Sequence, residues 1–220
     1  MFKAIIFDLD GTICHHKASY PKMFHEIFGE QFNKHSNVWL RHMMHNGAHT
    51  GMEAVNACFP HMSVAQQKEA LEHFTTRWAE CQKPFSGIFH AIALLKSHYN
   101  CQVGILTNGP SSFQWAVMNQ LHVSDYVDFA YASGDAFPAE NKPSVGLLRK
   151  LESKHGFSAN QALFIGDNLE KDINPARAAG WRALHIAPHE KEMTPFSIDA
   201  FEQAIETAEL LKVNWSTLTV

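Results

Sequence analysis

The sequence predicts an α/β fold, in which a Rossmann-like parallel sheet core is flanked by helices and carries an inserted all-helical cap domain. Two observations support this prediction. Over the C-terminal part of the chain, short apolar segments alternate with segments of helical period, which is the pattern of repeated strand–helix–strand units. Between residues 15 and 83, apolar residues recur only at helical spacing, and we expect no strand there.

The elements are expected in the following order. A buried strand over residues 3–7 opens the chain and ends at Asp8. In the helical insert, Leu71, Phe74 and Trp78 recur at i, i+3 and i+7, along one face of a helix. Beyond a turn at 84–87, the expected strands are 102–106, 127–132, 162–165 and 182–186, and the expected helices are 88–99, 113–121, 143–154, 168–179 and 198–211. The α/β core therefore takes residues 1–14 and 86–220, and the helical cap takes residues 15–85.

Composition narrows the function classes. Of 220 residues, 45% are hydrophobic, which is enough for a sizeable core, and the net charge is −4 without any block of Lys or Arg. We therefore expect neither a nucleic-acid nor a membrane partner. The apolar N-terminal stretch is too short for a signal peptide, and the four cysteines are widely spaced, so we expect a reduced, cytoplasmic protein without a disulfide framework or zinc site.

Polar residues stand where the predicted strands end. Asp8, Thr107 and Asp167 each directly follow an apolar strand or its closing glycine, and Lys142 lies in the loop after another strand. Ligands of open parallel sheets bind outside the carboxyl ends of the strands, so these four residues are expected to meet at one site. Carboxylates gathered there need a cation or a proton to offset their repulsion.

Four motifs now give the pattern a family resemblance. Their sequences are DLDGT at 8–12, TNG at 107–109, KP at 142–143 and GDNLEKD at 166–172. In this order they resemble the haloacid dehalogenase (HAD) superfamily, which places a helical C1-type cap between its first and second motifs. The layout is similar to the branch containing phosphoglycolate phosphatase, β-phosphoglucomutase, N-acylneuraminate-9-phosphatase and related nucleotidases.

The resemblance implies a role for each motif residue. Asp8 would be the nucleophile that forms an aspartyl-phosphate and also a Mg²⁺ ligand, and Asp10 would be the general acid and base, with its backbone carbonyl as a second ligand. Asp167 would be the third ligand and Asp172 a supporting carboxylate. Lys142, the Thr107 hydroxyl and backbone N–H groups including that of Asn108 would hold the phosphate. The chemistry needs the cation because an attacking carboxylate is repelled by a phosphate dianion.

The same residues could also have purely structural roles. Asp8 and Asp10 are also typical turn residues, and Lys142 could be a solvated loop lysine. Asp172 suits the N-terminus of a helix by charge alone, and Asn168 could cap that helix or contact a ligand.

Several residues at or near the cap are further candidates. Arg41 is the candidate for an anionic group of the substrate. His42 and His45 have i, i+3 spacing but no third metal ligand, His15 and His16 are near the hinge, and Cys14 either lines the entrance or is an inert buried thiol. Four aromatic residues form the cap core or stack on substrate: Trp39, Phe59, Phe74 and Trp78.

The leading functional prediction is a Mg²⁺-dependent phosphatase that hydrolyses a small soluble phosphomonoester, such as a sugar phosphate, nucleotide or phospho-acid. Asp10 disfavours dehalogenase and phosphonate-hydrolase chemistry, because relatives with those reactions lack this aspartate. A β-phosphoglucomutase-like phosphotransferase and a non-catalytic HAD-like binding protein remain as alternatives. The partner is expected to be a small phosphorylated metabolite, and the protein a monomer or homodimer.

Overall fold

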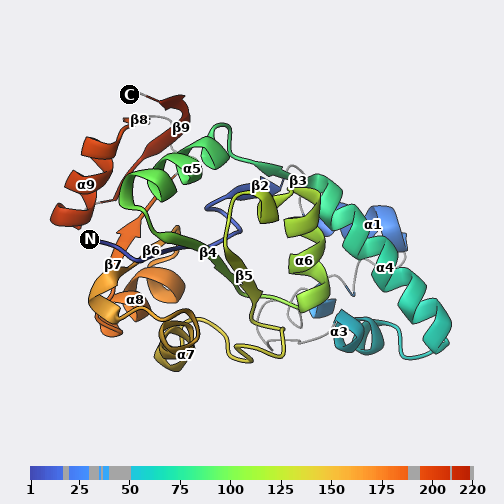
Figure 1. The fold of residues 1–220 in the computed structure, drawn as a ribbon. Helices are drawn as coiled ribbons and strands as arrows, with labels where there is room; N and C mark the ends of the chain where they lie inside the picture. The colour runs from blue at the N-terminus through green and yellow to red at the C-terminus, as the bar shows by residue number, and fades with distance from the viewer. Residues whose placement is uncertain are drawn as a thin grey trace.

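The computed structural model describes residues 1–16, 20–29, 35, 37–39, 51–187, 194–208 and 210–218. Its centre is a five-stranded sheet in which every neighbouring pair is parallel and the strand order is β5-β4-β1-β6-β7 (Figure 1). The strands are β1 (Ala4–Phe7), β4 (Gln102–Thr107), β5 (Phe129–Ala132), β6 (Ala162–Gly166) and β7 (Arg182–His185). The predicted α/β core with a Rossmann-like parallel sheet is confirmed.

Helices cover both faces of this sheet because its central strands are apolar on both sides. Ile5 and Phe7 pack with residues of α5, α6 and α9, whereas Ile6 packs with residues of α7 and α8. The bounds of these helices are α5 (Ile88–Tyr99), α6 (Ser111–Gln120), α7 (Val145–His155), α8 (Asn174–Ala178) and α9 (Ile198–Thr207). Strand β1 is fully buried in the middle, so its end at Asp8 has a fixed position.

The insert differs from the prediction at both of its ends. Strand β2 (Cys14–His16) pairs antiparallel with β3 (Gln82–Pro84), so the expectation of an all-helical insert with no strand between 15 and 83 is wrong there. The two strands are three residues long, too short to show a two-residue period, and each depends on a partner far away in the sequence. This two-stranded sheet lies where the chain passes from the core into the insert and back again.

The end of the chain also differs from the prediction. The helix expected to reach residue 211 stops at Thr207, and β9 (Val213–Leu218) follows, paired in parallel with β8 (Thr194–Phe196). Both strands bring large side chains to the core, where Phe196 and Trp215 are buried with ring centroids 5.1 Å apart. The helix expected over 168–179 is in two parts, a π-helical turn over Leu169–Ile173 and then α8.

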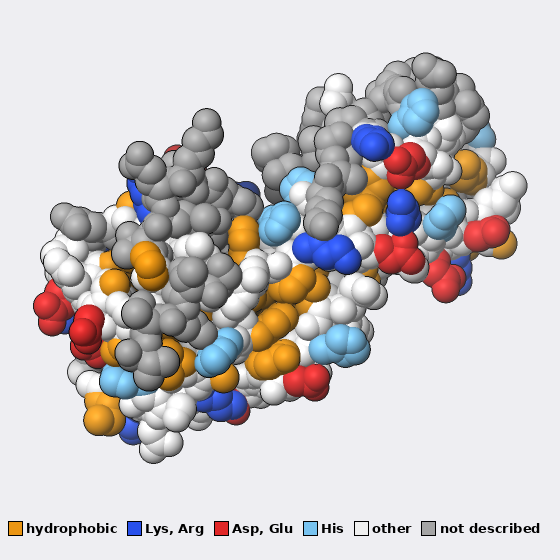
Figure 2. Space-filling view, turned by 90° about the horizontal axis from the view of Figure 1, so that it is seen from above, with side chains coloured by type: hydrophobic (Ala, Val, Ile, Leu, Met, Phe, Trp, Pro, Cys, Tyr) orange, Lys and Arg blue, Asp and Glu red, His pale blue; other side chains and the backbone are white. Residues whose placement is uncertain are grey.

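The insert has an aromatic core of its own. Its described long helices are α1 (Tyr20–Phe28), α3 (Gly51–Cys58) and α4 (Val64–Cys81). Trp39, Phe59 and Phe74 are buried together there, as the sequence predicts for a cap core; Phe24, which was not predicted, and Phe113 of α6 complete the cluster. These helices form the lobe at the right of Figures 1 and 2. We propose that this lobe is a separate cap with the predicted boundaries.

Arg41, His42 and His45 lie outside the described residues. Within the described part of the chain, none of the helices combines the length and the apolar character needed to span a membrane.

Candidate active site

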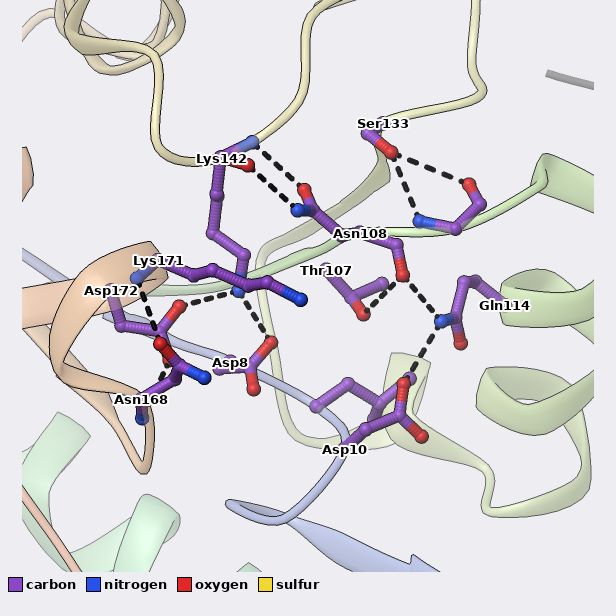
Figure 3. A network of polar contacts seen from close by, with 12 residues as sticks. Asp8, Asp10, Thr107, Asn108, Gln114, Ser133, Lys142, Asn168, Lys171 and Asp172 are labelled. Carbon is purple, nitrogen blue, oxygen red and sulfur yellow. Dashed lines mark hydrogen bonds and ion pairs between the residues drawn. The ribbon is translucent and has the colours of Figure 1, made fainter. Parts of the chain in front are cut away.

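The candidate site is a pocket of about 450 Å³ at the carboxyl ends of the central strands, and His16 and Trp78 of the insert are among the residues that line it. Asp8 and Asp10 follow β1, Thr107 ends β4, and Asp167 follows β6. Lys142 reaches the same pocket from the loop between β5 and α7 (Figure 3). The structure therefore brings the predicted core residues together, as expected for residues at the carboxyl ends of parallel strands.

Lys142 is buried and forms ion pairs with two of the carboxylates. Lys142 Nζ lies 2.6 Å from Asp8 Oδ1 and 2.6 Å from Asp172 Oδ1 (Figure 3), and all three residues are at most 6% exposed. Burial alone lowers the pKa of Lys142, but the two carboxylates outweigh it and raise that pKa, so the ammonium stays charged. The reading of Lys142 as a solvated loop residue is wrong.

Burial acts on the carboxylates with the opposite sign: it raises their pKa values, whereas burial alone lowers that of the lysine. Burial raises the pKa of Asp8 to about 7, although the Lys142 charge opposes the change. Burial also raises the pKa of Asp10, against a hydrogen bond from Gln114, and it raises the pKa of Asp167, helped by the negative charge of Asp172. One buried lysine therefore leaves negative charge uncompensated, which is the electrostatic setting of a cation site.

The donor set fits Mg²⁺. Asp8, Asp167 and Asp172 each offer a carboxylate oxygen, and these oxygens all lie within 4.8 Å of one another. Hard oxygen ligands of this kind suit Mg²⁺. Gly11 makes room for the set: it has a positive φ of 83°, and a Cβ there would stand 2.2 Å from Asp167 Oδ2. The Asp10 side chain is not among these three groups, and a metal contact through its backbone carbonyl stays a prediction.

Two asparagines organise the loops around the pocket. The Asn108 side chain accepts from Lys142 N at 2.8 Å and donates to Lys142 O at 2.9 Å, so it fixes the backbone that carries the lysine. Asn168 accepts hydrogen bonds from Glu170 N and Lys171 N, which is the predicted capping role, and it also lines the pocket. Thr107 is 1% exposed, and a hydrogen bond from its hydroxyl partly offsets the rise that burial causes in the pKa of Asp10.

The candidates at the cap have different positions. His16 and Trp78 line the pocket, with ring centroids 5.4 Å apart, so Trp78 is not only a cap-core residue. His15 instead packs on Phe85. Cys14 is fully buried and burial raises its thiol pKa well above the usual value, so it is the inert thiol rather than an entrance residue.

Sequence reasoning missed five pocket residues: Pro110, Phe113, Gln114, Asn141 and Lys171. Gln114 could have been found from its position, because it is the one polar residue in a run where Phe113, Val117 and Met118 mark the buried side of a helix. Lys171 has no comparable signal, since lysines are common on the exposed side of a helical segment.

A parallel sheet with clustered aspartates and a buried lysine at its carboxyl edge is typical of the active site of an α/β enzyme. The comparison with protein families gives the same answer from the sequence. Residues 2–180 match the model of the haloacid dehalogenase-like hydrolases, and the chain belongs to that family.

Curated relatives lie among the phosphatases. A phosphoglycolate phosphatase of Nitrosococcus oceani is 34% identical over 47% of this chain and 44% of its own length. A phosphoglycolate phosphatase of Mesorhizobium japonicum is 26% identical over 94% of this chain and 95% of its own. These matches confirm the sequence prediction of a phosphatase of the HAD superfamily.

Solved structures share the fold. A HAD phosphatase of Thermococcus onnurineus superposes with a TM-score of 0.66 at 16% identity, covering 97% of this chain and 95% of its own. A 2-haloacid dehalogenase of Pseudomonas syringae gives the same TM-score at 17% identity, covering 98% and 96%. Because dehalogenase and phosphatase share this fold, the reaction has to be argued from the site.

Proposed function

We propose that the protein is a Mg²⁺-dependent phosphatase that hydrolyses a small soluble phosphomonoester through an aspartyl-phosphate on Asp8. The observation that carries the proposal is the buried cluster in which Lys142 lies 2.6 Å from both Asp8 and Asp172, with Asp167 close by. Asp10 distinguishes this site from that of a dehalogenase, because it supplies a proton to an alkoxide, which is a poor leaving group.

The residues act in two steps. A carboxylate oxygen of Asp8 forms a bond to phosphorus while the bond from phosphorus to the ester oxygen breaks, and Asp10 gives its proton to the departing alkoxide. Asp10 then accepts a proton from water as that water attacks the aspartyl-phosphate, which releases inorganic phosphate and restores Asp8. Lys142 and the Thr107 hydroxyl stabilise the negative charge of the transferring group.

Asp8, the Asp10 carbonyl, Asp167 and, as a supporting group, Asp172 would hold the Mg²⁺. When bound, the ion neutralises charge on the phosphoryl oxygens and on the carboxylates around it. Asp172 also accepts a hydrogen bond from Asn168 N, so its carboxylate is fixed from two sides.

The pocket favours a metabolite as substrate. Its volume of about 450 Å³ is in the range of sites for small ligands. Trp78, Phe113 and Pro110 supply apolar surface beyond the phosphate position, and Lys171 adds a cation at the same pocket. Phosphoglycolate and glyceraldehyde 3-phosphate, which relatives are named for, are the first substrates to examine. All four cysteines are free thiols, which supports a cytoplasmic location.

Release of inorganic phosphate from a panel of phosphorylated metabolites tests the proposal. We expect the wild-type protein to release phosphate from small phosphomonoesters only when Mg²⁺ is present. The Asp8→Asn variant should release none. Transfer of the phosphoryl group to a second sugar hydroxyl, without release, would instead show a phosphotransferase. Phosphate release that persists in Asp8→Asn would refute the assignment.

A further inference from the structure

We propose that Gln114 is a positioning residue for Asp10: its side-chain amide fixes one oxygen of the Asp10 carboxylate as a hydrogen-bond acceptor and leaves the other oxygen to exchange the proton. This inference rests on the proposed function and deepens it, because it assigns the orientation of the general acid. Neither the motifs nor the comparisons point to Gln114.

The contacts are direct. Gln114 is on the first turn of α6 and is 6% exposed. Its Nε2 donates to Asp10 Oδ2 at 2.9 Å and to Asn108 O at 2.7 Å (Figure 3). Both distances are ordinary for N–H···O hydrogen bonds, and the two acceptors use both hydrogens of the amide nitrogen.

The Asn108 carbonyl decides which way the amide faces. A backbone carbonyl oxygen can only accept, so the nitrogen of Gln114 must point at it. Turning the amide over would place Oε1 against the Asn108 oxygen, and two acceptors would then face each other in a buried place. The amide therefore presents N–H to Asp10 Oδ2 whether or not Asp10 carries a proton. Because the carbonyl oxygen of a protonated carboxyl is its better acceptor, this contact favours Oδ1 as the oxygen that carries the proton given to the leaving group.

Surrounding residues keep the amide in place. Gly109, next to Asn108, has a φ of 145°, and a Cβ there would stand 2.7 Å from Gln114 Nε2, so this glycine is required for the contact. Phe113, the preceding residue, is 3% exposed and packs on Phe74 with ring centroids 5.8 Å apart. The start of α6 is thus anchored in the aromatic core of the insert while Gln114 points into the pocket.

The same contacts link the acid to the lysine. Asn108 binds Gln114 through its backbone carbonyl and binds the backbone of Lys142 through its side chain. Asp10, Gln114, Asn108 and Lys142 therefore form one hydrogen-bonded chain across the pocket (Figure 3). A general acid and a phosphate-binding cation are held in fixed relation without direct contact, which is what preorganised catalysis needs.

Leaving-group dependence distinguishes positioning from a merely structural role. Gln114→Met keeps the length of the side chain and removes both hydrogen bonds. An alkoxide leaving group needs the proton of Asp10, whereas p-nitrophenolate leaves without much help. We expect kcat/KM, which reports the first step, to fall in Gln114→Met by about 30- to 100-fold for an alkyl phosphate and less than about 3-fold for p-nitrophenyl phosphate. Gln120→Met, an exposed position on the same helix, is the matched control and should change neither.

A second variant and a second readout complete the test. Gln114→Glu keeps the shape but replaces the donor by an acceptor, and we expect the same selective loss. In the wild-type protein, the side-chain N–H₂ signal of Gln114 should be protected from hydrogen exchange, and Asp10→Ala should remove that protection at one hydrogen. Equal losses on both substrates, or an unprotected amide, would overturn the proposal. An enzyme that releases no phosphate would refute the proposed function, and the exchange measurement would still decide the position of Gln114.

Discussion

Replacing Lys142 with methionine removes the cation that two buried carboxylates share, at nearly constant side-chain length. Each of its contacts, to Asp8 and to Asp172, is 2.6 Å long. At an effective dielectric constant of about 20, Coulomb's law gives roughly 6 kcal/mol of attraction per contact, much of which is offset by the cost of desolvating the charges. Removing one partner of a buried pair typically costs about 3–5 kcal/mol, and we expect that loss in the free energy of unfolding without metal.

The loss should depend on pH. Because burial raises the pKa of Asp8 from 3.8 to about 7, the folded protein binds more protons than the unfolded chain between these values. The stability that this group contributes is therefore present at low pH and is lost as pH rises through about 7. Without the lysine the carboxylate is harder still to ionise, so Lys142→Met should be more destabilised at pH 8 than at pH 6.

Urea unfolding in EDTA, repeated with Mg²⁺, measures these effects. Lys96→Met is the matched control, since Lys96 Nζ lies 2.7 Å from Asp128 Oδ1 but both side chains are more than a third exposed. The control should lose no more than about 1 kcal/mol. Mg²⁺ should stabilise Lys142→Met more than the wild-type protein, because the ion replaces the missing positive charge. If Lys142→Met is no less stable in EDTA than the control, the carboxylates do not depend on this lysine.

Three further predictions concern the nucleophile and the metal. Asp8→Asn should still fold, as a cooperative thermal melt would show, but lower kcat more than 100-fold, about 2.7 kcal/mol of barrier; phosphate-release kinetics would detect a smaller loss. EDTA should abolish turnover, Mg²⁺ should restore it and Ca²⁺ should do so poorly, because Ca²⁺ takes more ligands at longer distance; full activity in metal-free buffer would contradict the metal assignment. Mg²⁺ affinity, measured by calorimetry, should rise with pH up to about 7 and then level off, since protons compete for Asp8, and a flat profile would show that Asp8 is not a ligand.

The sequence predicted the sheet and the meeting of the motif residues because both have local signals. Asp8, Thr107 and Asp167 each follow a strongly apolar strand, and parallel strands end at one edge of a sheet. The roles assigned to these residues remain predictions until they are measured.

What the sequence did not predict depends on contacts between distant segments. Strands β2 and β3 are short and pair only because the fold brings the two chain crossings together, and β8 and β9 likewise pair across a helix. Gln114 belongs to none of the four motifs. Its proposed role follows from its contact with Asp10, which is more than a hundred positions away in the sequence. Pattern reasoning finds residues that share a strand end, and it misses a helix side chain that reaches across to them.

The central claim is that Asp8 carries the phosphoryl group during turnover. Mass spectrometry of enzyme quenched in acid during hydrolysis of a good substrate tests this claim most directly. We predict one added phosphoryl group on the peptide that contains Asp8, present only with Mg²⁺ and absent from Asp8→Asn. A phosphoryl group on another residue, or sustained turnover in which Asp8 is never modified under rapid quenching, would contradict the account.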